Sequence, residues 1–227
     1  MHEPSQLAYD SIKYPHETHD WFLESAQNSS VFVNEISFAV QDFLKEDTEL
    51  TVDPCVQFAF LLRNPHHATV SFYKKCEGMF VEDEQNFSDL IGYKAAYELY
   101  NALSTRAIHK PIIILSENLY THPEETIKLF CKQASLAYKP EALVWPGLDN
   151  SFDGQEWHEI KHEQLMHHWH GDAIKSRGFA KPAHYDLDDK NYPTFIEVSD
   201  ERYREVCRKA YDANKYYYDL LLESVGP

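Results

Sequence analysis

Glycine is scarce in this chain, with seven among 227 residues. None of the seven lies in a strand–loop–helix context together with a basic residue and with serine or threonine. Such a context is typical of loops whose backbone N–H groups cradle a phosphate. The sequence therefore predicts no glycine-rich phosphate loop.

Cysteine and positive charge are also limited. The four cysteines, Cys55, Cys76, Cys131 and Cys207, lie far apart without a C-x-x-C pair, so neither a disulfide framework nor a cysteine zinc site is predicted. The formal net charge of -16 argues against nonspecific binding to nucleic acid or to an anionic membrane. A pocket that is basic inside an acidic surface can still hold an anion.

Long apolar runs and a secretory signal are not visible. The longest apolar runs, FAFLL and IIIL, have the length of strands and are too short to span a bilayer. The first residues, MHEPSQLAYD, have neither the basic n-region nor the apolar h-region of a signal peptide. We expect a cytoplasmic protein without a membrane span.

The composition and the patterns that are present favour a folded α/β domain. Hydrophobic residues make up 43% of the chain and aromatic residues 14%, which excludes a disordered chain and allows a single domain over residues 1–227. Short apolar runs alternate with longer helical patterns, which is typical of an α/β domain with a small parallel sheet. Strands are expected at 31–33, 56–62 and 111–115, and their continuous apolarity predicts burial on both faces. Helices are expected over 18–28, 36–45, 65–76, 88–104, 123–136, 155–168 and 200–223.

The segment WHEIKHEQLMHHWHGD contains the pattern H-E-x-x-H at His158, Glu159 and His162. In zinc hydrolases the two histidines bind the metal from one helical face and the glutamate activates a water molecule. The extended form of the motif needs a glycine where this chain has Leu165, and on a continuous helix His168 lies about 120° around from His162. The alternative is a solvent-exposed helix face that binds no metal.

A second segment, FAFLLRNPHHATVSFYKK, places an arginine at the end of a predicted strand. The strand ends at Leu62, Arg63 follows, and Asn64 can cap a helix that has Pro65 at its first position and Ser71 about two turns further on. Open α/β sheets bind ligands at the carboxyl ends of their strands, where an arginine and backbone N–H groups suit a phosphate. The alternative is an arginine that pairs with one of the many carboxylates.

This segment resembles the 3′-phosphate-binding segment of the sulfotransferases that use 3′-phosphoadenosine 5′-phosphosulfate (PAPS). The resemblance rests on a strand, then R-N-P, then a serine eight residues after the arginine, followed by two aromatic residues. Two further blocks, Pro111–Tyr138 and His167–Phe179, are similar to later segments of the family, so that the resemblance reaches to about Phe179. The matching positions in these blocks are Glu117, Leu119, Pro123, Glu124, Leu129 and Phe130, and then the run Ser176, Arg177, Gly178 and Phe179.

The resemblance implies a three-layer α/β/α domain related to the nucleotide kinases. It implies that Arg63 and Ser71 bind the 3′-phosphate of PAPS or of its product PAP, and that Lys175 or Arg177 adds positive charge near the nucleotide. The implied reaction is transfer of a sulfuryl group from PAPS to a hydroxyl or amine of a small-molecule or glycan acceptor. This reaction requires no metal.

The chain departs from the family most clearly at its start, because the first strand–loop–helix unit, which holds the 5′-phosphosulfate, is absent from these 227 residues. We expect such a unit to precede residue 1. A Glu-Pro pair follows it in related enzymes, which makes Glu3 the candidate base and His2 a less favoured substitute; the alternative is a chain end without a role. Some relatives also carry a lysine near the position of the neutral Asn34.

Two interpretations follow from that departure. Either the chain lacks its natural first segment and belongs to an enzyme, or it is a nonenzymatic nucleotide-binding or interaction protein on a degenerate sulfotransferase scaffold. Acceptor pockets in the family are built from variable loops, so no acceptor motif is expected in the sequence.

Overall fold

The computed structural model describes residues 31, 32, 34, 36–46, 49–76, 84–145, 171, 175–179, 195 and 198–225. The helices expected over 18–28 and 155–168 lie outside these residues. In chain order the described elements are α3 (Ser37–Glu46), η1 (Leu50–Val52), β1 (Ala59–Leu62), α4 (Pro65–Cys76), α5 (Glu84–Ile91), α6 (Tyr93–Arg106), β2 (Ile112–Leu115), α7 (Ser116–Thr121), α8 (Pro123–Gln133), η2 (Pro140–Leu143) and α10 (Glu201–Ser224).

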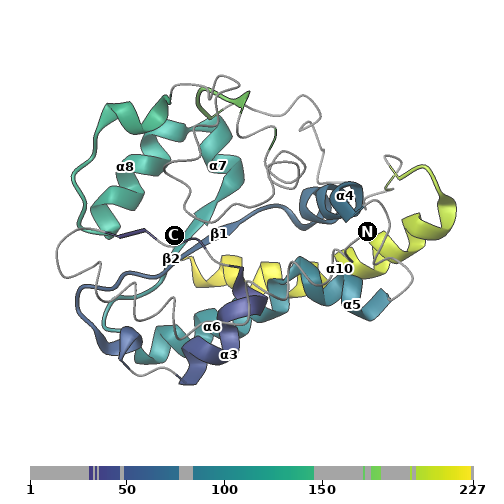
Figure 1. The fold of residues 1–227 in the computed structure, drawn as a ribbon, viewed down its shortest axis with the longest axis horizontal. Helices are drawn as coiled ribbons and strands as arrows, with labels where there is room; N and C mark the ends of the chain where they lie inside the picture. Colours follow the sequence, from purple (N-terminus) through teal and green to yellow (C-terminus); the bar gives the residue numbers. More distant parts are fainter. Residues whose placement is uncertain are drawn as a thin grey trace, which may run out of the picture.

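The two described strands form a small parallel sheet, which confirms the α/β class in its coarse form. Ala59 pairs with Ile112 and Leu62 pairs with Leu115, so that both strands end at the same edge. The connection between them runs through α4, α5 and α6, as a parallel pair requires a crossover. Figure 1 shows α7 and α8 on one side of the strands and α3, α6 and α10 on the other.

The prediction of a strand at 31–33 is wrong for Val31 and Phe32, the two residues of this range that the structure describes. Val31 and Phe32 have no strand conformation, and the Phe32 side chain is 84% exposed. A run of three apolar residues gains little from an extended conformation unless a neighbouring strand pairs with it. In the part of the chain that the structure describes, β1 and β2 pair only with each other.

The prediction that the strands are buried on both faces is also wrong for β1. Phe60 and Leu62 are buried, whereas Ala59 and Leu61 are exposed, with 64% of Leu61 accessible to solvent. Successive side chains of a strand point to opposite faces of the sheet, so the alternation shows that only one face of β1 is covered.

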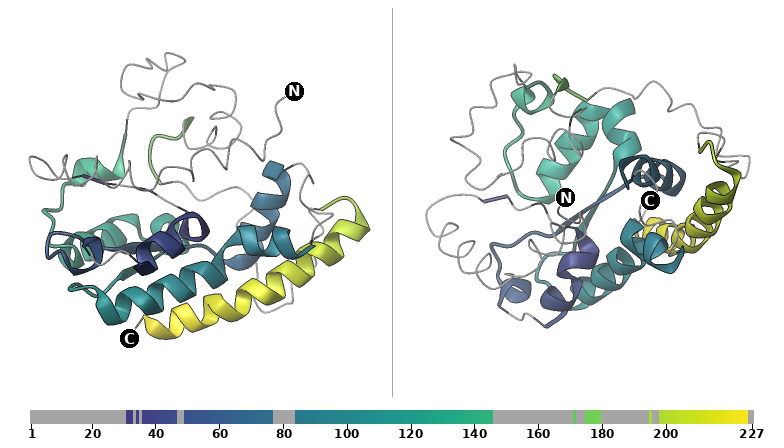
Figure 2. Two further views of the ribbon diagram at one scale, coloured as in Figure 1. Left: turned by 60° about the horizontal axis from the view of Figure 1, so that its bottom comes forward. Right: turned by 45° about the vertical axis from the view of Figure 1, so that its right-hand side comes forward.

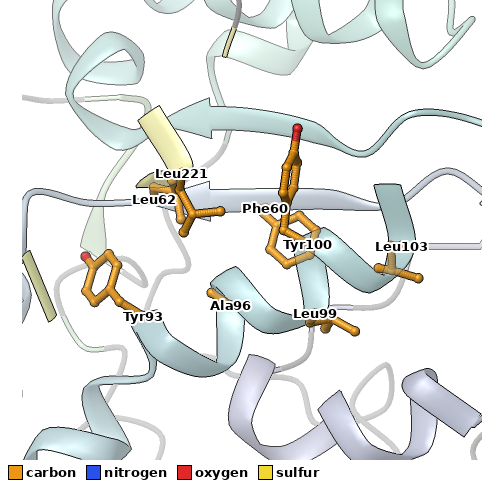
Figure 3. Close-up of a cluster of buried hydrophobic side chains, with 8 residues drawn as sticks. All are labelled: Phe60, Leu62, Tyr93, Ala96, Leu99, Tyr100, Leu103 and Leu221. Carbon is orange, nitrogen blue, oxygen red and sulfur yellow. The ribbon is translucent and has the colours of Figure 1, made fainter. Parts of the chain in front are cut away.

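The covered face of β1 packs on α6 and α10 in the first hydrophobic cluster. Figure 3 shows the buried members of this cluster, to which β1, α6 and α10 all contribute. They are Phe60, Leu62, Tyr93, Ala96, Leu99, Tyr100, Leu103 and Leu221. A second cluster joins α5 to α10 and contains Phe87, Phe195, Val198, Val206, Cys207, Ala210 and Tyr211. Helix α10 therefore belongs to both clusters, and it lies beside α6 in the views of Figure 2.

The helix expected over 88–104 is interrupted. Helix α5 ends at Ile91 and α6 begins at Tyr93, with Gly92 between them at a φ of 88°. Only glycine adopts this left-handed conformation without strain, so the chain changes direction here. The helix expected over 123–136 also ends early, at Gln133, because Ser135 has a φ of 57°. The helix expected over 65–76 has those bounds in the structure.

Candidate phosphate-binding site

A pocket of about 260 Å³ lies where β1 leads into α4. Its described lining combines two cationic side chains and a hydroxyl with four apolar side chains: Arg63, Ala68, Ser71, Phe72, Lys75, Leu90 and Ile91. The structure thus brings together Arg63 and Ser71, the two residues that the sequence predicts as phosphate ligands. Figure 1 shows α4 and α5 gathered with the first part of α10 at this end of the domain.

One face of α4 supplies four of the lining residues. Ala68, Ser71, Phe72 and Lys75 are spaced by three, one and three positions, and this spacing places them along one side of a helix. Lys75 follows Ser71 by four residues and so lies one turn beyond it. The family resemblance does not mark Lys75, although its helical spacing from Ser71 is visible in the sequence.

The start of α4 is fixed by its cap. The Asn64 side-chain oxygen accepts a hydrogen bond of 2.9 Å from the backbone N–H of His66, and Pro65 occupies the first helical position. This arrangement confirms the predicted cap and satisfies a backbone donor that has no partner within the helix. The cap fixes where α4 begins relative to Asn64, the residue after Arg63. It therefore also fixes the positions of Ser71 and Lys75 relative to Arg63.

The backbone at Arg63 and Asn64 is held from two sides. A carboxylate oxygen of Glu117, at the start of α7, accepts a hydrogen bond of 2.8 Å from the Asn64 N–H. The hydroxyl of Tyr93, at the start of α6, donates to the Arg63 carbonyl oxygen. Arg63 directly follows β1 and Glu117 lies two residues after the end of β2, so the contact joins the carboxyl ends of the two strands.

Tyr93 is itself positioned by α10. Its backbone N–H donates to the Asn214 side-chain oxygen at 3.1 Å, and the Asn214 amide nitrogen donates to the Ser88 carbonyl at 3.0 Å and to the Ala210 carbonyl at 2.9 Å. The buried Asn214 therefore caps α6 at the Gly92 interruption. Burial raises the pKa of the Tyr93 hydroxyl well above its usual range, and the nearby Tyr218 adds to the increase. The Tyr93 hydroxyl therefore remains a neutral donor above the pH at which an exposed tyrosine loses its proton.

The chemistry of the lining suits a phosphate. An arginine offers a planar fork of N–H donors, a serine offers a hydroxyl and a lysine offers an ammonium group. The described lining residues include no carboxylate, although the chain has a net charge of -16. The volume is slightly below the roughly 300–1,000 Å³ typical of pockets that bury a whole ligand, so it suits a phosphate group and part of the molecule that carries it.

The other two predicted cationic residues do not line this pocket. Lys175 and Arg177 have exposed side chains. Their segment is attached instead to residues 143–145, where the Trp145 N–H donates to the Arg177 carbonyl at 3.3 Å and the Trp145 indole N–H donates to the Ser176 hydroxyl at 3.1 Å. Gly178 pairs with Val144 in an antiparallel bridge. At Gly178 a Cβ atom would lie 2.9 Å from the Leu143 carbonyl oxygen, so this close approach requires glycine.

Several predicted site residues lie outside the described residues. They are Glu3, His2, His158, Glu159, His162 and His168. Among the residues that the structure does describe, no group of three or more histidine, cysteine, aspartate or glutamate side chains could hold a metal ion. No helix in the same set is long and apolar enough to cross a membrane.

Comparison of the chain with protein-family models, with curated proteins and with solved structures gives no match.

Proposed function

We propose that this protein is sulfotransferase-like and that it binds PAPS and its product PAP through the 3′-phosphate, in the pocket at the end of β1. The observation that carries the proposal is that Arg63 and Ser71 line one pocket. These two residues lie in the segment that resembles the 3′-phosphate site of the family. The proposal includes the finer fold, a three-layer α/β/α domain related to the nucleotide kinases, and the helices on both sides of the parallel strands support it.

The fit between the pocket and a phosphate supports this assignment. Arg63 can contribute two N–H donors to a phosphate, and Ser71 can contribute one hydroxyl. Hydrogen bonds that involve a charged group are about twice as strong as neutral ones, so Arg63 is expected to contribute more than Ser71. The bonds from Glu117 and Tyr93 to the adjoining backbone limit the motion of the turn that carries Arg63.

The proposed reaction is transfer of the sulfuryl group of PAPS to a hydroxyl or amine of a small-molecule or glycan acceptor. The bond between sulfur and the phosphate oxygen breaks, a bond from sulfur to the acceptor forms, and a base takes the acceptor proton. Glu3 is the candidate base, and no metal is needed. A nonenzymatic nucleotide-binding or interaction protein on the same scaffold would share the 3′-phosphate site and would lack the transfer step.

The assignment of the pocket is tested by calorimetric titration of PAP into the wild-type protein and two variants. We expect Arg63→Ala to weaken PAP binding by roughly tenfold to a hundredfold, because it removes a charge-assisted contact worth about 1.5–3 kcal/mol. Ser71→Ala is expected to weaken binding about threefold to tenfold. Lys94→Ala, which removes an exposed positive charge from α6 outside the pocket, is the control and is expected to retain the wild-type affinity.

A comparison of PAP with adenosine 5′-phosphate distinguishes binding of the 3′-phosphate from binding of the rest of the nucleotide. Adenosine 5′-phosphate lacks the 3′-phosphate, so its weaker binding is expected to be the same in Arg63→Ala and in the wild type. Equal PAP affinity in wild type and Arg63→Ala would contradict the site. Release of PAP from PAPS that depends on an added acceptor then distinguishes the enzyme from a nonenzymatic binding protein.

A further inference from the structure

We propose that Lys75 is a third phosphate-binding residue and that it makes the pocket selective for a phosphomonoester over a phosphodiester. This inference rests on the proposed function only for the identity of the nucleotide. The chemistry of the phosphate group is inferred from the pocket itself. Lys75 lines the pocket from the same face of α4 as Ser71.

The position of Lys75 differs from that of its neighbour Lys74. Both lysines lie in the last turn of α4, but Lys75 lines the pocket and is partly buried, whereas Lys74 is exposed and is not among the described lining residues. Consecutive residues point about 100° apart around a helix, and of the two lysines only Lys75 lies on the side of α4 that carries Ala68 and Ser71. The helix therefore provides two lysines of equal charge, of which one belongs to the site.

The number of donors matches a monoester. A phosphomonoester has three terminal oxygens and a charge of about -1.5 to -2 near pH 7. The guanidinium of Arg63 can bind two of these oxygens, which leaves the third for Ser71 and Lys75. The two positive charges of Arg63 and Lys75 together balance the charge of a monoester, whereas a diester carries one charge and has two terminal oxygens.

The apolar part of the lining strengthens this selectivity. Ala68 and Phe72 of α4 and Leu90 and Ile91 of α5 complete the pocket without adding a charge. Apolar neighbours reduce the local dielectric, so the attraction between a bound phosphate and the two cations is less weakened than in bulk water. The same side chains can contact the carbon atoms of the group that carries the phosphate.

The test compares Lys75→Ala with Lys74→Ala, using adenosine 3′-phosphate and inorganic phosphate as probes. Both variants lose one positive charge and one long side chain from the same turn of α4. We expect Lys75→Ala to weaken binding of adenosine 3′-phosphate about tenfold or more, and Lys74→Ala less than about threefold, because only Lys75 makes a direct charged contact. Titrations at about 0.15 M salt limit long-range effects, since the Debye length is then about 8 Å.

Two further measurements sharpen the comparison. Lys75→Arg is expected to keep most of the affinity, because it restores a cation on a long side chain. Adenosine 3′,5′-cyclic phosphate, a diester, is expected to bind at least about tenfold more weakly than adenosine 3′-phosphate to the wild type, and to lose less affinity in Lys75→Ala. Circular dichroism and thermal unfolding of each variant exclude a change of fold as the cause.

Each outcome decides the proposal. Equal losses in the two lysine variants, or an unchanged affinity in Lys75→Ala, overturn the role of Lys75 even where PAP binding depends on Arg63. Binding of phosphate and adenosine 3′-phosphate that depends on Lys75, together with PAP binding no tighter than inorganic phosphate, supports Lys75 and contradicts the proposed nucleotide. Absence of binding by every probe overturns both proposals.

Discussion

At the scale of single residues, the candidate site depends on two side chains, Tyr93 and Glu117, that are not among the described lining residues of the pocket. Tyr93 holds the carbonyl of Arg63, and Glu117 holds the N–H of Asn64. A backbone fixed by two hydrogen bonds loses less conformational freedom when a ligand binds, and preorganisation of this kind increases affinity. Tyr93 and Glu117 therefore position the turn that carries Arg63 and are not among the described lining residues of the pocket.

Tyr93→Phe is expected to change how stability depends on pH. Burial raises the folded-state pKa of Tyr93 above its ordinary value of 10. The buried neutral hydroxyl therefore contributes its full stabilisation below about pH 10, and that contribution falls as the pH rises above 10, by up to about 1.4 kcal/mol per pH unit. Phenylalanine does not titrate, so the variant is expected to be about 1 kcal/mol less stable at pH 7 and to lose less stability between pH 10 and 11.

Urea unfolding at a series of pH values from 7 to 11 measures this difference. The thiols of Cys76 and Cys207 also titrate in the alkaline range, because burial raises their pKa values to about 11 and about 12, but they are present in both proteins and cancel in the comparison. The same slope above pH 10 in wild type and variant would show that Tyr93 is not the group responsible.

The site residues differ in how well the sequence could predict them. Arg63 and Ser71 belong to one short segment, so a local pattern is sufficient to find them. Lys75 lies in that segment as well, and helical spacing could have identified it. Tyr93 contacts Arg63 across 30 positions and contacts Asn214 across 121, and no local pattern predicts contacts of that separation.

At the scale of elements, the interruption between α5 and α6 positions both Tyr93 and the apolar wall of the pocket. Ile91 ends α5 and lines the pocket, and Gly92 changes the direction of the chain. Tyr93 then begins α6 and donates its hydroxyl hydrogen bond to the Arg63 carbonyl. On a continuous helix Tyr93 would be rotated by about 200° from Ile91, so the interruption sets the direction of Tyr93 relative to the lining residues of α5.

Gly92→Ala is expected to destabilise the fold by about 1–2 kcal/mol, because a residue with a Cβ atom is strained at a φ of 88°. Steric crowding adds little, since the new Cβ would lie 3.4 Å from the Phe38 ring. Gly92→Asn is the matched variant and is expected to lose less, because asparagine tolerates the left-handed region better. Urea unfolding measures both, and equal losses in the two variants would contradict the conformational explanation.

The strands expected at 56–62 and 111–115 are present as β1 and β2, and the helices expected over 65–76 and 200–223 are present as α4 and α10. The strand at 31–33 and the burial of β1 on both faces were predicted wrongly. The cap at Asn64 is visible in neighbouring residues, and the pattern of the last helix lies within one segment. Helices α4 and α10 begin and end within one residue of their expected bounds. A strand at 31–33 would require a partner strand, and burial of Leu61 would require a layer that covers the second face of β1. Both depend on parts of the chain that are distant in sequence, so apolarity alone predicted them wrongly.

At the scale of the whole molecule, the charge is strongly unbalanced. Lysine and arginine together number 21, against 37 aspartate and glutamate residues. The described ion pairs, such as Lys209 with Glu84 at 2.9 Å, lie at the surface and contribute little to stability. Repulsion among the remaining carboxylates opposes the compact state.

Sodium chloride is therefore expected to stabilise the protein. Between about 20 mM and 500 mM salt the Debye length falls severalfold, which screens the repulsion. We expect Tm at pH 7.5 to rise by about 2–4 °C, which corresponds to about 1 kcal/mol for a chain of this size. Differential scanning calorimetry measures the shift, and a lower Tm at high salt would mean that attractive ion pairs dominate over net repulsion.

The hydrogen bonds of Asn214 also determine which truncated fragments of the chain can keep the pocket. Helix α10 follows the last segment that resembles sulfotransferases, yet its Asn214 holds Tyr93, which in turn holds Arg63. A fragment that stops after Phe179 would retain every residue named by the resemblance. It would lose this support, Leu221 of the first hydrophobic cluster and all buried members of the second cluster except Phe87. The smallest fragment that keeps the described pocket and its hydrogen-bonded support therefore includes α10.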